Sequence, residues 1–195
     1  PHNLTECCDA ICAYIDNPEI TIEELMQYVK GPDFPTGGII QGRQGIKDAF
    51  ETGRGRIVIR SKTEIEVNDS GRETIVVTEI PYMVNKREMI EKIAELVETK
   101  KVEGIAYIND ETTMKGVRVV IRLKKDANAN VVLNMLYKYS PLQSSFSVNN
   151  VALVNGRPRT LNLKQLIKYF VRHRHEVILR RTRFDLEKAR KRAHI

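Results

Sequence analysis

The stretch that decides the fold is RETIVVTEI, residues 72–80, followed by NKREMIEKIAELV, residues 85–97. The first run is rich in β-branched residues, which is typical of a strand. In the second run Asn85 and Glu88 have the spacing of a helix cap. Apolar residues then recur at helical spacing at Met89, Ile90, Ile93, Leu96 and Val97. The stretch predicts a strand followed by an amphipathic helix.

The residues that follow continue this alternation. Strands are expected at 103–109 and 117–123, and a helix at about 127–139. Strand-like segments at 145–153 and near 158–161 flank the turn Asn155–Gly156. From residue 72 to about 153 the order is β-α-β-β-α-β, which is the ferredoxin-like order. The sequence therefore predicts an α+β fold with an antiparallel or mixed sheet.

The residues before this stretch predict a smaller helical region and a long strand. Asn3 and Thr21 have the spacing of helix starts, and the second helix is expected to end at Gly31. Prolines and glycines make residues 31–38 irregular, and a short helix is expected near 43–52. A strand over 55–67 and a turn at 68–71 lead into the stretch above.

The strand expected at 55–67 sorts basic from apolar residues. Alternate side chains on a strand share a face, so Ile57, Ile59, Ile65 and Val67 should lie opposite the basic ones. Same-face residues are about 6.6 Å apart, close to two phosphate steps along one DNA strand. The pattern fits a phosphate-binding face and equally a solvated surface strand. The candidate DNA-binding residues are Arg43, Lys47, Arg54, Arg56, Arg60 and Lys62.

Positive charge is concentrated near the C-terminus. Residues 156–195 hold thirteen Lys and Arg against three Asp and Glu, a balance of +10, whereas the whole chain carries +7. Residues 163–195 contain no Pro or Gly and keep helical spacing of apolar residues. This predicts a helix of over thirty residues, typical of an arm or coiled coil, that is cut off before a cap. A basic extension on a near-neutral body favours a polyanionic partner, although solubility alone also explains it.

No residue pattern in the chain predicts catalysis or metal binding. Cys7, Cys8 and Cys12 crowd into one expected helix, where we interpret them as packing residues in a reducing, cytosolic protein. His173 and His175 lie on opposite sides of the long helix and cannot share a metal. No apolar run is long enough to span a membrane. Few aromatic residues accompany the basic strand, which favours duplex over single-strand binding.

Several motifs resemble the A subunit of bacterial DNA gyrase. They include GPDFPTGGIIQG at 31–42, TGRG at 52–55, EIPY at 79–82 and RHRHEV at 172–177. The resemblance covers essentially the whole chain. The A subunit of topoisomerase IV shares GPDFPT and is the near neighbour, while residues 157–168 and FVRHR at 170–174 favour gyrase.

The resemblance implies a type IIA topoisomerase, which breaks one duplex, passes another through it and reseals the break. It implies an A-subunit homodimer that binds double-stranded DNA, with a B subunit that supplies ATP hydrolysis and Mg²⁺. The family's catalytic Arg–Tyr pair lies in a winged-helix domain upstream of Pro1. No tyrosine of this chain follows an arginine, so none is expected to be the nucleophile.

By the same resemblance, residues 1–30 are helices linked to the missing domain, 31–161 form the tower domain and 162–195 begin the coiled-coil arm. Such a tower supports the arms of the bent duplex. Two further hypotheses remain: an RNA-binding domain, because the ferredoxin-like order also occurs there, and a structural dimerisation module. The aromatic motif of RNA-recognition domains is absent, which argues against the first.

Overall fold

The computed structural model describes residues 1–195 and groups them into two compact units. Unit 1 comprises Pro1 with residues 33–45 and 56–147, and unit 2 comprises residues 2–32, 46–55 and 148–195. Each unit is therefore built from separate stretches of the chain. The three consecutive domains expected from the sequence stay a prediction about the organisation of the whole protein.

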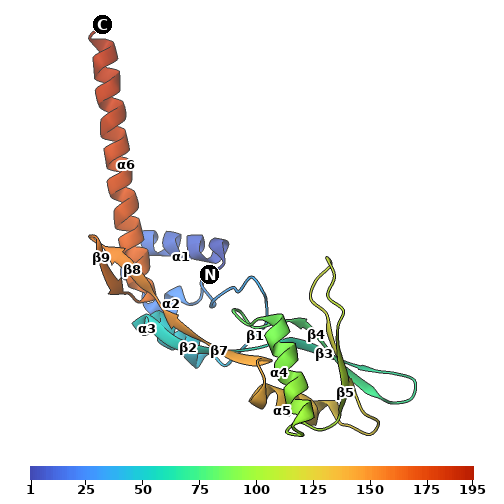
Figure 1. Ribbon diagram of the computed structural model, residues 1–195. Coiled ribbons are helices and arrows are strands. Elements are labelled where there is room, and N and C mark those ends of the chain that lie inside the picture. The colour runs from blue at the N-terminus through green and yellow to red at the C-terminus, as the bar shows by residue number, and fades with distance from the viewer. The chain divides into compact units, whose positions relative to one another are not determined.

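Unit 1 contains a four-stranded antiparallel sheet with the strand order β3-β4-β6-β5. Its strands are β3 (Lys62–Val67), β4 (Glu73–Glu79), β5 (Ile105–Asp110) and β6 (Val119–Leu123). Two helices, α4 (Lys86–Glu98) and α5 (Ala129–Tyr139), belong to the same unit (Figure 1). Their caps are asparagines: Oδ1 of Asn85 accepts the N–H of Glu88 at 3.1 Å, and Asn128 caps α5 in the same way.

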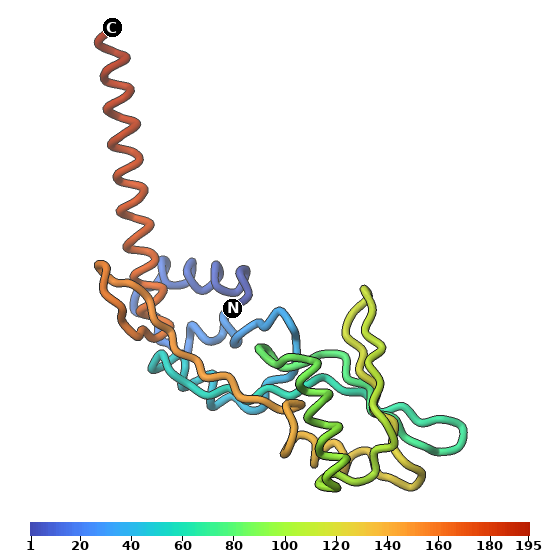
Figure 2. Tube along the Cα trace, viewed as in Figure 1, coloured from blue at the N-terminus to red at the C-terminus, as the bar shows by residue number.

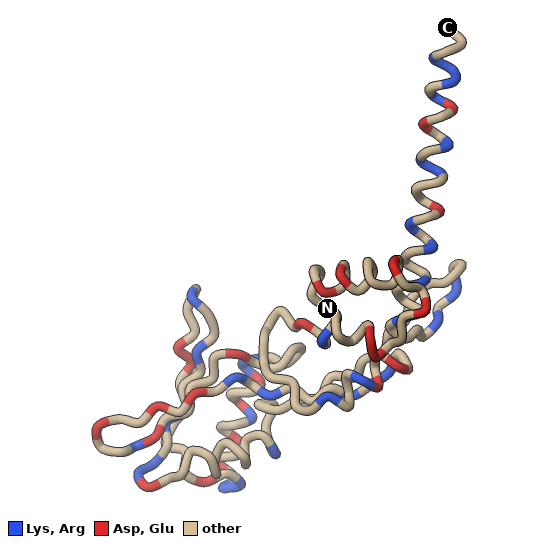
Figure 3. The backbone as a smooth tube through the Cα atoms, turned by 180° about the vertical axis from the view of Figure 1, so that it is seen from behind, with Lys and Arg blue, Asp and Glu red and all other residues tan.

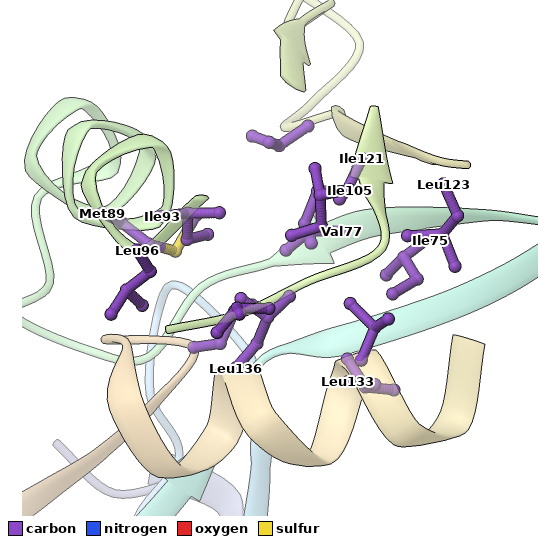
Figure 4. Close-up of a cluster of buried hydrophobic side chains, with 14 of the residues drawn as sticks. Ile75, Val77, Met89, Ile93, Leu96, Ile105, Ile121, Leu123, Leu133 and Leu136 are labelled. Atoms are coloured by element: carbon purple, nitrogen blue, oxygen red, sulfur yellow. The ribbon is translucent and has the colours of Figure 1, made fainter. Parts of the chain in front are cut away.

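The core of unit 1 lies between this sheet and the two helices. Figure 4 shows Met89, Ile93 and Leu96 of α4 and Leu133 and Leu136 of α5 gathered against the sheet residues. The sheet contributes every second residue of its two central strands, because alternate side chains share one face. These residues are Ile75, Val77, Val119, Ile121 and Leu123. Val76 and Val120 on the opposite face are buried as well. The α+β class and the order β-α-β-β-α-β are thus confirmed.

The last strand of that order does not join the four-stranded sheet. β7 (Gln143–Asn149) belongs instead to a three-stranded sheet with the order β1-β2-β7, together with β1 (Ile39–Gln41) and β2 (Arg54–Arg60). The edge position beside β4 is taken by β3, which pairs antiparallel with β4. A tight turn makes this pairing local, because Oδ1 of Asn68 accepts the N–H groups of Ser70 and Arg72 at 3.1 and 2.9 Å.

The single strand expected at 55–67 is wrong, because Ser61 divides it into β2 and β3. Ser61 is buried, and its N–H donates to the carbonyl of Leu142 at 2.8 Å, outside either ladder. A register shift follows between Lys62 and Thr63. The apolar face therefore does not continue: Ile57 and Ile59 are each 1% exposed, whereas Val67 is 64% exposed on β3.

Unit 2 is mainly helical and includes a hairpin. Its elements are α1 (Leu4–Asp16), α2 (Ile22–Leu25), α3 (Gln44–Thr52, from Ile46 onward), the hairpin of β8 (Val151–Val154) and β9 (Arg157–Thr160), and α6 (Leu163–Ala193). α1 and α2 pack against α6. Two boundaries differ from the prediction. α2 ends at Leu25 rather than Gly31, and Asn150 separates β7 from β8 because its N–H donates to the carbonyl of Gly53.

The long helix α6 confirms the helix predicted over residues 163–195, but the expectation that it lacks a cap is wrong, because it ends at Ala193 with His194 as its C-cap. It has 31 residues and begins at a capping box of Asn162 and Gln165. Leu163 and Ile167 are buried in unit 2, and every residue from 178 onward is exposed. Figure 2 shows the trace of α6 extending past the β8–β9 hairpin. Neither α6 nor any other helix combines the length and the apolar character needed to cross a membrane.

The interpretation of the three cysteines as packing residues is correct only for Cys7. Cys7 is half-buried and lines an apolar cavity of about 190 Å³ with Phe50 and Ile167, and this burial raises the pKa of its thiol. Cys8 and Cys12 are exposed. The helix phase explains the difference, since Cys8 and Cys12 are four residues apart and share the outer face of α1.

Candidate nucleic-acid interface

The alternation predicted for the basic strand holds within β2. Arg54 and Arg56 are exposed, while Ile57 and Ile59 are buried. Both arginines lack an ion-pair partner, because the six salt bridges of the chain involve other residues. Their guanidinium groups are therefore available to an external anion. Arginine donates up to five hydrogen bonds in a planar fork that matches a phosphate.

Arg60 lies on the same strand but is bound within unit 1. Its Nε donates to Oε1 of Gln143 at 2.7 Å, and its guanidinium lies 4.4 Å from the ring centroid of Tyr137. The side chain is half-buried. Tyr137 belongs to α5, far along the chain from the basic strand, so the sequence around Arg60 does not indicate this contact. Arg60 thus joins a strand to a helix.

The remaining predicted residues are exposed but scattered. Arg43 precedes α3. Lys62 is the first residue of β3 and lies opposite Glu79 in the register with β4. Lys47 lies on α3, where its Nζ is 3.9 Å from Oε1 of Glu51. Arg43, Arg56, Arg60 and Lys62 belong to unit 1, whereas Lys47 and Arg54 belong to unit 2. Arg60 and Lys62 do not share a strand face, because Ser61 separates their two sheets.

Within the positively charged residues 156–195, unit 2 contains a basic cluster arranged around a tyrosine that the sequence did not single out. Arg159 of β9 donates from Nη1 to the hydroxyl of Tyr169 at 3.2 Å, and its guanidinium is 5.9 Å from the ring centroid. Arg172, one turn further along α6, lies 5.5 Å from the same centroid. The spacing of three between Tyr169 and Arg172 on one helix was the signal available in the sequence. Tyr169 is therefore shared by two arginines.

The positive charge of residues 156–195 is not neutralised within the chain. All six salt bridges are formed by residues within the range 47–118, so none involves β9 or α6. Figure 3 shows Lys and Arg recurring along α6 and along the neighbouring hairpin. Unpaired surface charge of one sign raises the local concentration of oppositely charged partners.

Asp110 and Lys86 form an ion pair at the surface of unit 1. Oδ2 of Asp110 is 2.9 Å from Nζ of Lys86, and its Oδ1 accepts the N–H of Thr112 at 3.0 Å. The hydrogen bonding from Thr112 and then Lys86 lowers the pKa of Asp110 below its ordinary value. No three His, Cys, Asp or Glu side chains gather anywhere in the chain to hold a metal ion.

Two of the motifs that carried the resemblance meet in unit 1. Phe34 stacks on Tyr82 with ring centroids 5.3 Å apart, and the N–H of Gly38 donates to Oε1 of Glu79 at 3.4 Å. A Cβ on Gly37 would collide with the carboxyl group of Glu79. The family model that describes the A subunit of DNA gyrase/topoisomerase IV matches residues 1–195. The chain belongs to this family.

Three relatives in the DNA gyrase/topoisomerase IV family show the extent of the match. The DNA gyrase A subunit of Clostridium acetobutylicum is 55% identical over 195 residues, 100% of this chain and 24% of that protein. The gyrase A subunits of Ureaplasma parvum and Salmonella typhimurium are each 57% identical over 100% of this chain, 23% and 22% of their lengths. The chain thus spans less than a quarter of the relatives it matches.

Proposed function

We propose that these residues are the part of a DNA gyrase A subunit that supports and grips the bent duplex beside the break during ATP-dependent supercoiling. The observation that carries the proposal is the family match over the whole chain. Arg54 and Arg56 of β2 and the basic residues of β9 and α6, none of which is in a salt bridge, support it. In this proposal residues 31–161 act as the tower domain and α6 begins the coiled-coil arm.

The chemistry of the exposed residues suits support rather than sequence reading. Arginine contacts to phosphates fix the position of a duplex but carry no sequence information. Bending a site of 20–30 base pairs costs on the order of 1–6 kcal/mol, so several contacts must offset it. We assign these contacts to Arg43, Arg56 and Lys62 in unit 1 and to Lys47 and Arg54 in unit 2. Arg60 positions β2 through Gln143 and Tyr137.

The proposal places the chain in a larger, cytoplasmic assembly. Two A subunits would pair with two B subunits, and the B subunit would supply ATP hydrolysis and Mg²⁺. The nucleophilic tyrosine would lie outside residues 1–195. Tyr169 is the tyrosine whose hydroxyl accepts a hydrogen bond from an arginine, so it is the residue to check. Incubation with plasmid and B subunit should give no cleavage or relaxation, and a DNA adduct on Tyr169 would refute this assignment.

The salt dependence of duplex binding tests the proposed phosphate contacts. Each phosphate contact contributes about 0.9 to the slope of log K against log salt. Replacing Arg56 by Ala should lower the slope of binding to a 30-base-pair duplex by about 0.9. Arg87→Ala is the matched control, because Arg87 is exposed on α4 and already pairs with Glu91 at 3.0 Å. An unchanged slope for Arg56→Ala would remove β2 from the interface.

Topoisomerase IV remains the second candidate, because the family description covers both enzymes. The relatives described above are gyrase subunits. Supercoiling of relaxed plasmid by the complete enzyme would support gyrase, whereas decatenation without supercoiling would support topoisomerase IV. The RNA-binding hypothesis is less favoured, since the central strands β4 and β6 carry no aromatic residue for base stacking.

A further inference from the structure

We infer that Arg159, Tyr169 and Arg172 form a second duplex-binding site in unit 2, in which one tyrosine ring holds two arginines for neighbouring phosphates of one strand. The inference rests on the proposed function, because it takes the same ligand. It adds a site formed by β9 and α6, apart from the basic residues of β2. We call these three residues the arginine pair site.

The geometry of the site holds both guanidinium groups near one ring. The centroid of Tyr169 is 5.9 Å from Cζ of Arg159 and 5.5 Å from Cζ of Arg172. A cation within about 6 Å of an aromatic centroid is attracted to the ring. The hydroxyl of Tyr169 also accepts a hydrogen bond from Arg159. The ring therefore limits the motion of two side chains that would otherwise lose considerable entropy on binding.

The donors of both arginines remain largely unused. Arg159 uses Nη1 for Tyr169, and neither arginine is in a salt bridge. Beside Tyr169 and Arg172 lies an open groove of about 150 Å³, bordered by the β8–β9 turn and by His173 and Glu176 of α6. Glu176 is the single acidic residue lining this groove. The groove gives an anion access to Arg172.

The site belongs to a wider basic surface of unit 2. Arg157 precedes Arg159 on β9, and Lys164 and Lys168 precede Arg172 at intervals of four residues on α6. Residues four apart on a helix lie on the same side, so these lysines lead along one side of α6 toward Arg172. A run of cations on a helix side fits the regularly spaced phosphates of a duplex better than it fits a single small anion.

A substitution that changes no charge tests whether Tyr169 orients the two arginines for DNA binding. Tyr169→Ala removes no charge, yet it should lower the slope of log K against log salt for a 30-base-pair duplex by about 0.9–1.8, because one or both arginines lose their orientation toward a phosphate. Arg159→Ala and Arg172→Ala should each lower it by about 0.9. Tyr169→Phe keeps the ring and should give a smaller decrease. The matched control is Phe184→Ala, since Phe184 is an exposed aromatic residue of α6 whose ring centroid lies 5.1 Å from Nζ of Lys188.

Thermal melting of each variant identifies loss of folding. If Tyr169→Ala does not fold, the two exposed arginine variants decide. A folded Tyr169→Ala with the wild-type slope overturns the arginine pair site, as do wild-type slopes for both arginine variants. If the wild-type chain has no affinity for the duplex, the proposed function fails as well. If Arg56→Ala flattens the slope and the arginine pair variants do not, the failure concerns this inference only.

Discussion

Arg60 offers the most direct test of how the basic strand works, because its position differs from that of Arg56. Replacing Arg60 by Ala removes the hydrogen bond to Gln143 at 2.7 Å and the contact with Tyr137 at 4.4 Å. A hydrogen bond from a charged donor contributes about 1.5–3 kcal/mol, and a cation–π contact about 0.5–1 kcal/mol where partly exposed. We expect Arg60→Ala to lower the free energy of unfolding by about 2–4 kcal/mol.

The same change should have little effect on duplex binding, because Arg60 already uses its side chain within unit 1. Urea unfolding followed by circular dichroism measures the stability loss, and anisotropy of a labelled duplex measures the salt slope. Arg56→Ala is the matched control, and it should have almost no effect on stability. It should reduce the salt slope by about 0.9, which is a roughly 3.5-fold change in the ratio of the affinities at 50 and 200 mM salt.

A double-mutant cycle identifies the partner. Gln143→Ala should cost much less in the Arg60→Ala background than in the wild type, because the hydrogen bond is already absent. Additive costs would show that the two side chains do not interact. If Arg60→Ala left stability unchanged and flattened the salt slope as Arg56→Ala does, Arg60 would be a DNA contact and its structural role would be wrong.

Three further changes test the fold. Gly53→Ala should destabilise unit 2 more than Gly156→Ala, because both residues have positive φ (+83° and +77°) but only a Cβ on Gly53 meets another group, the Leu161 carbonyl oxygen at 2.6 Å; equal melting temperatures would contradict this. Asp110→Asn should lower the free energy of unfolding by less than about 1 kcal/mol. Because folding lowers the pKa of Asp110, this stabilisation is complete above the ordinary carboxyl pKa of 3.8 and is lost as the pH falls below it, which unfolding measured at a series of acidic pH values checks. Leu136→Ala, at a fully buried position of α5, should cost about 2–5 kcal/mol in urea unfolding, and Val131→Ala on the exposed side should cost less than about 0.5 kcal/mol.

Local chemistry explains why the element order could be predicted. The caps at Asn3, Thr21 and Asn85 depend on residues three positions apart, and each side chain accepts the expected backbone N–H. The turn at Asn68 and the apolar spacing of α4 are equally local. These features require no knowledge of distant residues, because they arise within one or two helical turns or one hairpin.

The candidate site could be predicted only in part. The exposure of Arg54 and Arg56 follows from strand alternation, which is a property of neighbouring residues. The engagement of Arg60 depends on Tyr137, and that of Arg159 on Tyr169. Both tyrosines come from other elements, so composition and spacing along the basic strand could not show which arginines remain available to DNA.

The sequence by itself determined the family, the α+β class, the element order and the long basic helix, since these depend on motifs and periodicity along the chain. The tertiary structure decided that β2 and β3 are separate strands in different sheets, because Ser61 between them is fixed by the distant carbonyl of Leu142. It also decided which cations are committed to the fold. A guanidinium stacked on a ring and bonded to a glutamine stabilises the protein, whereas an unpaired one can bind phosphate, and only packing distinguishes them.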